Sequence, residues 1–380
     1  MGEFYIPFNK PYMTGRELFY IAEAYSNGAL SGDGPFTKKC HEWLEENTGT
    51  QRALLTHSCT ASLEMAAILA DIRPGDEIIM PSFTFVSTAN AFVLQGGTPV
   101  FVDIRPDTLN IDETKIVAAI TSHTKAIVVV HYAGISVEMD TIMEIASHYG
   151  LIVIEDAAQG IMSTFKGRPL GSIGHMGAYS FHETKNITSG EGGALLINDD
   201  RFSDRAEIIR EKGTNRSQFF RGQVDKYTWV DIGSSYLPGE VTAAFLWAQL
   251  QESLSITQKR MSIWNVYHKA FEVLEVFGKL RRPIVPDGCH HNAHMYYLLF
   301  NTEKNRNDMI INLNSQGINS VFHYVPLHSA PAGRKYGRIS GKMENTEALS
   351  NRLMRLPLWI GLDKSIGSVI ERVNIAMSYI

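Results

Sequence analysis

A single lysine, Lys185, lies between a short apolar stretch and a glycine-rich turn in the segment SFHETKNITSGEGGALLI, residues 180–197. A lysine that follows a strand is more often a solvated surface residue. Here, however, Ser180 and His182 precede it, and the glycines of GEGG let the backbone approach a ligand without an intervening Cβ. To act as a nucleophile, the amine must have its pKa lowered from about 10.4 by burial or by a nearby positive charge. One use of such a lysine is a Schiff base with pyridoxal phosphate (PLP).

A carboxylate suited to the PLP ring nitrogen lies upstream. The segment VIEDAAQG places Asp156 at the carboxyl end of an expected strand, with Gln159 three residues later. Proteins of the α/β class bind ligands at this end of their strands, and a buried carboxylate there keeps a pyridine nitrogen protonated. The alternative, equally common at a strand-to-helix turn, is that Asp156 only caps the next helix. Glu155 should point to the opposite face of the sheet.

Two expected helix starts offer the other groups that PLP requires. In THSCTASLEMAA, the hydroxyls of Ser58 and Thr60 and the backbone at Ala61 lie where a phosphate dianion is favoured. In PSFTFVSTANA, Phe83 and Phe85 offer an aromatic face for the pyridine ring. Each signal alone is weak, because Ser and Thr begin most helices and aromatic residues are mostly core. Their combination with a carboxylate and a lysine is more specific.

The elements that would position these residues follow a βαβ pattern. Between residues 50 and 200, short β-branched runs alternate with stretches of helical period, which predicts crossover helices on an α/β sheet. Four apolar runs predict buried parallel strands: 77–81, 98–103, 126–131 and 151–156. The runs at 177–181 and 193–199 are joined by a loop instead of a helix, so the sheet should be mixed at that end.

A change in the sequence pattern after Asp231 predicts a second domain. A long helical pattern begins there, and we expect a large α/β domain over residues 1–250, including the N-terminal segment. Residues 251–380 should form a smaller α+β domain with strands at 294–300 and 320–328.

Charge and composition exclude several classes of partner. A net charge of -5 over 380 residues leaves no basic stripe for nucleic acid, so a small-molecule partner is favoured. No stretch approaches the roughly 20 apolar residues that cross a bilayer, and the N-terminus lacks a signal-peptide pattern, so we expect no membrane insertion. Three cysteines, Cys40, Cys59 and Cys289, show neither metal-type nor paired spacing, which fits a reducing, cytoplasmic location and predicts no metal site.

Taken together, the segments SCTASLEMA, PSFTFVSTANA, VIEDAAQG and SFHETKNITSGEGGALLIND resemble the nucleotide-sugar aminotransferases of the DegT/DnrJ/EryC1/StrS type over nearly the whole chain. The resemblance implies the aspartate-aminotransferase-like fold (fold type I), with a mostly parallel, seven-stranded-type sheet in the large domain. Further stretches, among them LSGDGPFTKKCHEWLE, RPDTLNIDE and HYVPLH, are most similar to members that aminate TDP-4-keto-6-deoxyglucose for enterobacterial common antigen.

The resemblance also implies roles for individual residues. Lys185 would form the Schiff base, Asp156 would meet the pyridine nitrogen, Gln159 would meet the ring hydroxyl, and Phe85 would stack on the ring. The phosphate would be bound by a set of polar groups: Thr60, the Ala61 backbone and Ser180.

A homodimer with shared active sites is implied as well, since the family normally completes its phosphate site from the neighbouring subunit. At the matching stretch, DIGSSYLPGE, the chain has Ser235 where many relatives have asparagine, and Leu237 where they often have arginine. The detail of the cross-subunit contact therefore stays open, with Ser235 as its candidate.

The implied reaction is a two-step exchange. L-glutamate displaces Lys185 and leaves as 2-oxoglutarate, and the resulting pyridoxamine phosphate condenses with the 4-keto group of a TDP-linked 6-deoxyhexose. The freed Lys185 moves the proton between the C4′ carbon of the cofactor and C4 of the sugar. The expected product is TDP-4-amino-4,6-dideoxygalactose, for a cell-surface polysaccharide such as lipopolysaccharide. Amination at C3 requires the same catalytic groups and stays an alternative.

Candidate substrate-binding residues lie in two segments. The loop NRSQFFRGQVDKYTW mixes basic and aromatic side chains suited to a pyrophosphate and a thymine ring: Arg216, Arg221, Lys226, Tyr227 and Trp229. The alternative is a solvated surface loop. The binding role is favoured because ordering a long basic-aromatic loop costs conformational entropy, unless the loop meets a ligand or a second subunit. His323 and His328 in HYVPLH are candidates for the sugar pocket, although a lone histidine is more often structural.

Three other classes are less favoured. A PLP-dependent sugar 3-dehydratase would replace Lys185 with histidine, and a non-catalytic sensor would be expected to have lost Lys185 or Asp156. A nicotinamide dehydrogenase is not favoured, because no expected strand is followed by G-x-G-x-x-G.

Overall fold

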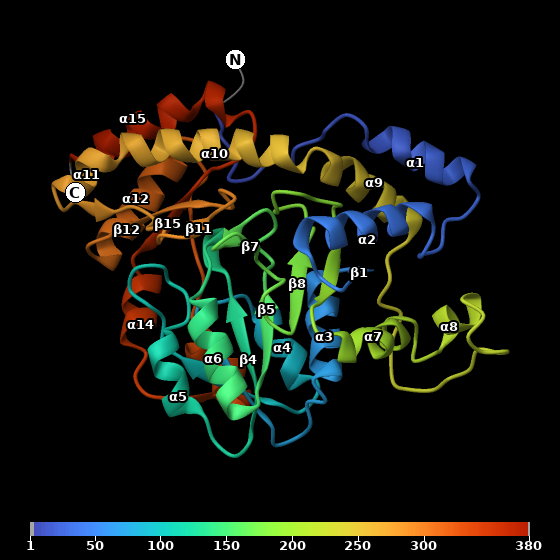
Figure 1. Ribbon diagram of the computed structural model, residues 1–380. Coiled ribbons are helices and arrows are strands. Elements are labelled where there is room, and N and C mark those ends of the chain that lie inside the picture. Colours follow the sequence, from blue (N-terminus) through green and yellow to red (C-terminus); the bar gives the residue numbers. More distant parts are fainter. Residues whose placement is uncertain (1–3, 379–380) are drawn as a thin grey trace.

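The predicted parallel strands form the middle of an eight-stranded sheet in a computed structural model that describes residues 4–378 (Figure 1). The strand order is β1-β9-β8-β5-β4-β2-β3-β14. Their bounds are β1 (Arg52–Thr56), β2 (Glu77–Pro81), β3 (Thr98–Val102), β4 (Thr124–Val130), β5 (Ile152–Asp156), β8 (Met176–Ser180), β9 (Gly193–Ile197) and β14 (Arg338–Ile339). Strand β9 is antiparallel to both β8 and β1, which confirms the expected mixed end.

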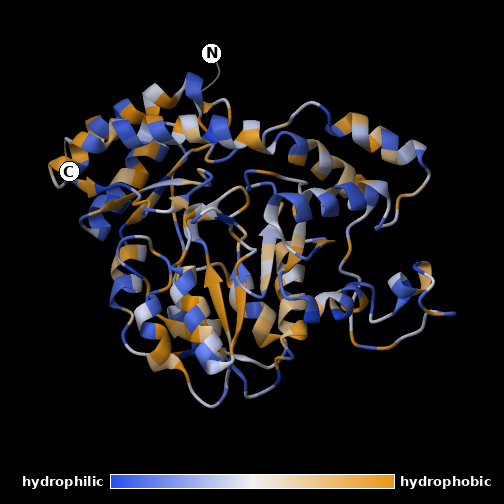
Figure 2. Ribbon diagram, viewed as in Figure 1, coloured by the Kyte–Doolittle hydropathy of each residue, from blue (hydrophilic) through white to orange (hydrophobic). Residues whose placement is uncertain are grey.

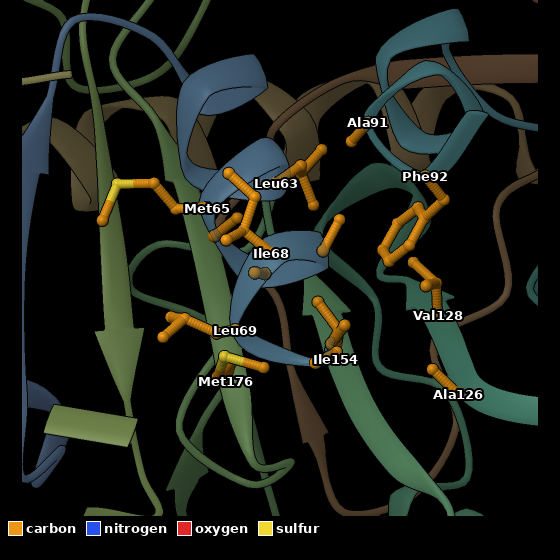
Figure 3. Close-up of a cluster of buried hydrophobic side chains, with 14 of the residues drawn as sticks. Leu63, Met65, Ile68, Leu69, Ala91, Phe92, Ala126, Val128, Ile154 and Met176 are labelled. Carbon is orange, nitrogen blue, oxygen red and sulfur yellow. The ribbon is translucent and has the colours of Figure 1, made fainter. Parts of the chain in front are cut away.

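Helices cover both faces of this sheet because the side chains of each strand alternate between them. The first face is covered by α3 (Cys59–Leu69), α4 (Val86–Val93) and α7 (Ser203–Arg210). Figure 3 shows Leu63, Ile68 and Phe92 of this layer against side chains of three strands: Val128, Ile154 and Met176.

The second face is covered by two groups of helices. One consists of α1 (Glu17–Ser26), α2 (Pro35–Thr48) and α9 (Glu240–Gln251), and the other of α5 (Ile116–Ala119) and α6 (Met139–Tyr149). In the hydropathy-coloured ribbon, the central strands are accordingly among the most apolar parts of the chain (Figure 2). The expected crossover helices are therefore confirmed.

A smaller antiparallel sheet follows in the C-terminal part, in the order β10-β12-β15-β13. Its strands are β10 (Leu280–Arg281), β12 (Tyr296–Phe300), β13 (Val321–Phe322) and β15 (Leu353–Leu356), and α10 (Ser253–Ala270), α12 (Glu303–Ser315) and α15 (Ile366–Met377) share its core. The strand expected over 320–328 is shorter than predicted. It ends at Phe322, and the 3-10 turn η4 (Leu327–Ser329) follows Pro326, which has no N–H to donate to a ladder.

The remaining elements are short. They are the helices α8 (Arg216–Phe220), α11 (Glu272–Val276), α13 (Pro331–Tyr336) and α14 (Glu344–Ser350), the 3-10 turns η1 (Glu113–Lys115), η2 (Tyr132–Gly134), η3 (Asp200–Phe202) and η5 (Leu362–Lys364), and the small sheet of β6 (Thr164–Phe165), β7 (Arg168–Pro169) and β11 (Cys289–His290). None of the helices in residues 4–378 is long and apolar enough to cross a membrane.

The large part and the C-terminal part of the chain are linked at several places. Helices α9 and α10 are separated only by Glu252, close to the expected boundary at residue 250. However, Ile6 pairs with Ile318 of the C-terminal part, and β14 joins the edge of the large sheet. The division into residues 1–250 and 251–380 stays a prediction, and these contacts tie the two parts firmly together.

Candidate active site

Half of the predicted site residues line one cavity of about 590 Å³. It lies at the carboxyl ends of the parallel strands, where Asp156 is the last residue of β5 and Ser180 the last of β8. The predicted residues that line it are Ser58, Thr60, Phe85, Asp156, Gln159, Ser180, Lys185 and His323. The C-terminal part closes the cavity on another side with residues of β13, β15 and the loops beside them. The fold therefore gathers residues that are more than 260 positions apart in the sequence.

Asp156 is a buried carboxylate with few partners. One oxygen accepts a hydrogen bond from the Thr88 hydroxyl at 2.6 Å, and the other accepts the N–H of Ala158 at 3.2 Å. Burial raises the pKa of Asp156 despite these two bonds, so the group lacks a full set of charge partners. A cationic ligand in the cavity would supply the missing stabilisation.

The neighbouring Glu155 points to the opposite face, as the alternation of strand side chains predicts. It accepts hydrogen bonds from the N–H groups of Gly171, Ile173 and Gly174 and lies 2.8 Å from Nε2 of His131. Glu155 thus fixes the loop before β8, whereas Asp156 is left to the cavity.

Lys185 lies in the loop between β8 and β9, and burial lowers the pKa of its amine. Its backbone N–H bonds to the carbonyl of His182 at 2.9 Å, which forms a turn. The adjacent Asn186 donates to the carbonyl of Asn292 at 2.8 Å, and Asn292 in turn donates to the carbonyl of Gln159 at 2.8 Å. These buried amides hold the lysine loop against the loop after β5, on which Gln159 lies.

Gln159 is fixed in orientation by both ends of its amide. Its Oε1 accepts the N–H of Ala133 at 2.7 Å, so its Nε2 faces the cavity and donates to the hydroxyl of Tyr324 at 3.2 Å. A donor in this position suits a phenolic oxygen of a ligand.

The start of α3 lines part of the cavity with Ser58, Cys59 and Thr60. Ser58 is the N-cap, and its hydroxyl accepts the N–H of Ala61 at 3.1 Å. Ala61, whose backbone is expected to bind the phosphate, does not line the cavity, because its N–H is taken up by this cap. The hydroxyl of Thr60 donates to Ser87 at 2.8 Å. A Cβ at Gly193 would lie 2.5 Å from the backbone N of Cys59, which explains the glycine at this crossing. The first N–H groups of such a helix favour an anion.

Aromatic side chains form another wall. Phe85 lines the cavity and is 57% exposed, so its ring is accessible from the cavity. His323 is buried, and its Nδ1 lies 2.8 Å from the hydroxyl of Tyr132. His323 therefore reaches the cavity as predicted, but one of its nitrogens already has a partner.

The basic-aromatic segment does not line the cavity of its own protomer. Figure 1 shows α8 and the chain around it on the side of the molecule beyond α7, away from β4 and β5. Arg221 pairs with Glu207 at 2.8 Å, Arg216 lies 3.5 Å from Glu211, and Ser235 forms an isolated bridge to Glu211. The other predicted members are exposed: Lys226, Tyr227 and Trp229. Their role in substrate binding stays a prediction that needs a second subunit.

His328 also lies outside the cavity. Its Nδ1 is 2.7 Å from the hydroxyl of Ser82, its backbone N–H donates to the same oxygen at 3.0 Å, and its Nε2 is 3.3 Å from Glu347. This buried position favours the structural alternative over a place in the sugar pocket.

Several residues that line the cavity were not among the predicted site residues. His182, His294, Tyr324 and Arg355 line the cavity, as do Phe8 and Asn9 from the N-terminal segment. Tyr324 lies within HYVPLH and could have been proposed beside His323. Arg355 and Phe8 enter the site only because β15 and the N-terminal segment meet above it.

Fold and cavity together define a class of protein. A large, mostly parallel sheet with a smaller α+β part, and an amine and a carboxylate at the carboxyl ends of its strands, is the arrangement of the aspartate-aminotransferase-like fold. The family model of the DegT/DnrJ/EryC1/StrS aminotransferases matches residues 11–374, and the chain belongs to this family.

Individual relatives agree with this assignment. The spore coat polysaccharide biosynthesis protein SpsC of Bacillus subtilis is 34% identical over 382 residues, which cover 97% of this chain and 96% of SpsC. The structure of the aminotransferase TlmJ from Streptoalloteichus hindustanus has a TM-score of 0.91 at 28% identity and covers 99% of this chain and 100% of TlmJ. Spr1654 of Streptococcus pneumoniae, in its PLP form, has a TM-score of 0.90 at 26% identity, with 99% of each chain covered. These relatives point to PLP as the cofactor.

Proposed function

We propose that this protein is a PLP-dependent aminotransferase that moves an amino group from L-glutamate to the 4-keto carbon of a TDP-linked 4-keto-6-deoxyhexose. The product would be TDP-4-amino-4,6-dideoxygalactose, for a cell-surface polysaccharide. The observation that carries this proposal is the placement of Lys185 and Asp156 in one cavity, with a lowered pKa for the amine and a raised pKa for the carboxyl group.

The residues of the cavity fit PLP. The under-satisfied carboxylate of Asp156 suits a protonated ring nitrogen, the donor of Gln159 suits the ring hydroxyl, and Phe85 presents a free ring face. Ser58, Thr60 and Ser180 line the cavity near the start of α3 and would bind the phosphate. The backbone N–H of Ala61 would join them only on leaving the hydroxyl of Ser58. When bound, PLP supplies an electron sink for the exchange of the amino group.

Lys185 has two tasks in this proposal. Because burial lowers the pKa of its amine, Nζ is more readily deprotonated than that of a surface lysine and can anchor the cofactor covalently. After release, the same Nζ takes a proton from the donor carbon and later delivers one to the sugar carbon. Asp156 would keep the ring nitrogen of bound PLP protonated, and Thr88 and Ala158 hold its carboxylate in place.

The choice of substrate rests on similarity in stretches outside the catalytic core, such as LSGDGPFTKKCHEWLE and RPDTLNIDE. The name of SpsC, a relative involved in spore coat polysaccharide biosynthesis, supports a role in making a surface polysaccharide.

A homodimer would bring the basic-aromatic segment to a second active site. Large apolar side chains are exposed on α1 and in or just after this segment, including Leu18, Phe19, Trp229 and Ile232, and a second copy of the chain would cover them. Ser235, which follows the segment, would reach the partner's phosphate site.

The test uses absorption and product analysis. The purified protein should show a near-ultraviolet or visible PLP band that L-glutamate converts and that Lys185→Ala loses. Given TDP-4-keto-6-deoxyglucose and glutamate, it should form the 4-amino sugar, identified by NMR. A PLP band without amination at C4 would leave the cofactor assignment standing and refute the substrate.

A further inference from the structure

Two hydroxyl groups form a chain from the wall of the cavity to Asp156. Thr84 lines the cavity just before α4, and Thr88 lies in the first turn of that helix. The two hydroxyl oxygens are 2.7 Å apart, and the oxygen of Thr88 is 2.6 Å from Oδ2 of Asp156. All three residues are buried. The chain therefore joins the start of α4 to the end of β5 through side chains alone.

An ionised carboxyl group at Asp156 fixes the direction of both hydrogen bonds. A carboxylate only accepts, so Thr88 must donate its single hydroxyl hydrogen to Asp156. Thr88 then has only lone pairs to offer, and Thr84 must donate to it. Because hydrogen bonds in such a chain polarise one another, the bond from Thr84 strengthens the bond that reaches the carboxylate.

Thr88 is used differently from an ordinary helical threonine. Threonine hydroxyls inside helices often bond back to the carbonyl four residues earlier. The hydroxyl of Thr88 instead donates to a side chain 68 positions away in the sequence. The other buried residues of α4 that follow it, Ala91 and Phe92, are apolar, so packing alone would accept a valine here. The hydroxyl is therefore needed for its bond to Asp156.

Asp156 depends on this bond more than another buried aspartate does on its own. Asp103 accepts four hydrogen bonds, from two N–H groups, a lysine amine and the hydroxyl of Thr346. Burial raises the pKa of Asp103, but these bonds outweigh burial and leave its pKa lowered. Asp156 has the hydroxyl of Thr88 and the N–H of Ala158 as its donors within residues 4–378, and burial leaves its pKa raised.

The charges around Asp156 do not replace the hydroxyl chain. In the described part of the chain, the titratable groups that face Asp156 are Lys185, His131, Cys59 and Tyr324. The two basic groups lower the pKa of Asp156 less than the hydroxyl of Thr88 does. Burial raises the pKa of the thiol and of the phenol, and the charge of Asp156 adds to that rise, so neither supplies a positive charge.

We propose that Thr88, supported by Thr84, is a positioning residue that keeps Asp156 ionised, so that the proton stays on the ring nitrogen of PLP. This inference rests on the proposed PLP-dependent function. Thr88 does not line the cavity, so it acts through Asp156. A proton between a ring nitrogen and a carboxylate is divided according to the difference between their pKa values. Each unit by which the pKa of Asp156 rises moves that ratio about tenfold toward the carboxyl group.

The first experiment titrates Asp156 in the protein without cofactor. Carbon-13 NMR of the aspartate carboxyl carbons gives the pKa, and Asp156→Asn assigns the signal. Thr88→Val should raise the pKa of Asp156 by about one to two units, because a hydrogen bond to the charged form is lost. Thr88→Ser should keep the wild-type value, and Thr84→Val should cause a smaller rise, because it removes only the polarising bond. An unchanged pKa in Thr88→Val would overturn the proposal.

The second experiment observes the ring nitrogen itself. Each protein is loaded with nitrogen-15-labelled PLP, whose NMR shift distinguishes a protonated from a neutral pyridine. Wild type and Thr88→Ser should show the protonated ring, whereas Thr88→Val should shift toward the neutral ring and lose about tenfold in kcat. A fully protonated ring in Thr88→Val, even with a lower kcat, would assign Thr88 a purely structural role and overturn the proposal.

Thr346→Val is the matched control. Thr346 is also buried, and its hydroxyl donates to Asp103 at 2.7 Å, outside the cavity. The variant loses the same kind of bond, so its stability should fall by a similar amount, while the pKa of Asp156 and the ring nitrogen stay as in wild type. If circular dichroism shows that Thr88→Val is unfolded, Thr88→Ala takes its place with the same expected shifts.

The two experiments separate this inference from the proposed function. A wild type that lacks a PLP band would refute the proposed function, and the titration without cofactor would still decide whether Thr88 controls the charge of Asp156. A normal PLP band, with Asp156 titrating alike in wild type and Thr88→Val, would refute only the inference.

Discussion

The cavity around Lys185 and the segment from residue 211 to residue 236 differ in how their polar side chains are held. In the cavity, Asp156 and Gln159 are buried, and each has hydrogen bonds that fix its orientation. In the segment, Arg216 and Arg221 pair with nearby glutamates, and Trp229 is 77% exposed. One region is ordered by the interior of a single chain, and the other lies largely on its surface.

This difference assigns different tasks to the two regions. Catalytic groups need orientation to within fractions of an ångström, which only a packed scaffold with supporting hydrogen bonds provides. A surface segment with exposed aromatic and basic side chains is suited to a partner that orders it on contact. We therefore expect substitutions in the cavity to change chemistry, and substitutions in the segment to change binding between subunits or to the substrate.

The largest effect is expected for Lys185→Ala. Without the amine, both the covalent anchor and the proton carrier are lost, so kcat should fall by about 10⁴-fold or more. Single-turnover measurements of PLP conversion by glutamate test this directly. A variant that retains more than a tenth of wild-type turnover would show that the cavity is not the catalytic centre.

Asp156→Asn should have the next largest effect. The amide keeps the size of the side chain but cannot balance a positive ring nitrogen, so we expect kcat to fall about 10²- to 10³-fold. Glu191→Gln is the matched control, because Glu191 lines the same cavity but is largely exposed, and its effect should stay below about threefold. Equal losses in both variants would contradict the special role of the buried carboxylate.

The segment is tested by mixing an inactive variant with a variant that binds the nucleotide sugar weakly. Lys185→Ala lacks the amine, and Arg216→Ala combined with Arg221→Ala lacks the basic groups, which we expect to raise the KM for the nucleotide sugar about tenfold or more. If the segment acts in the partner's active site, half of the dimers after exchange are mixed, and each contains one intact site. Activity at low substrate should then recover to about a quarter of the wild-type value.

Two controls make the mixing experiment decisive. Lys185→Ala taken through the exchange procedure alone should stay inactive. When it is mixed with wild type, activity should fall only in proportion to the fraction of active sites that lack the amine. If the segment acts only on its own protomer, the mixture should show no more than the residual activity of the double variant, and the shared site would be refuted.

The two predicted histidines of HYVPLH, His323 and His328, allow the same comparison over a short stretch of chain. His323 lines the cavity, whereas His328 is held by Ser82, so His328→Ala should leave the KM for both substrates unchanged. It should lower the free energy of unfolding by about 1–3 kcal/mol, because the Ser82 hydroxyl loses a buried partner. Kinetics together with chemical denaturation check this, and a raised KM for the sugar at unchanged stability would restore His328 to the substrate site.

Much of the large domain could be predicted from local patterns. The apolar runs became strands within a residue or two, because continuous β-branched runs are buried on both faces of a parallel sheet. Lys185, Asp156 and Thr60 could be found because each lies beside a strand end or helix start, where local sequence fixes the position of the side chain. The strand expected over 320–328 failed because Pro326 and the turn at Leu327 override its apolar character.

Residues that reach the cavity from distant segments could not be predicted in this way. Arg355 lies in an ordinary short strand, and its unpaired charge becomes visible only when Phe8 and Lys185 are placed beside it. Likewise, β14 reaches the edge of the large sheet from residue 338, and two residues of strand carry no recognisable pattern. Such contacts depend on how distant parts of the chain meet.

The smallest expected effect concerns the stability of the protein without its cofactor. The pKa of Lys185 is lowered by burial in the folded chain and is about 10.4 in the unfolded chain, so between these two values the unfolded state binds more protons. The free energy of unfolding of the wild type should therefore rise with pH in this window relative to Lys185→Met, by at most about 1.4 kcal/mol per pH unit. Below the window, Lys185→Met should be the more stable protein, because it buries no charge. Urea titrations of both proteins between pH 7 and pH 10 measure the difference, and parallel stability curves would mean that the amine is as well solvated as the surface lysines of the segment.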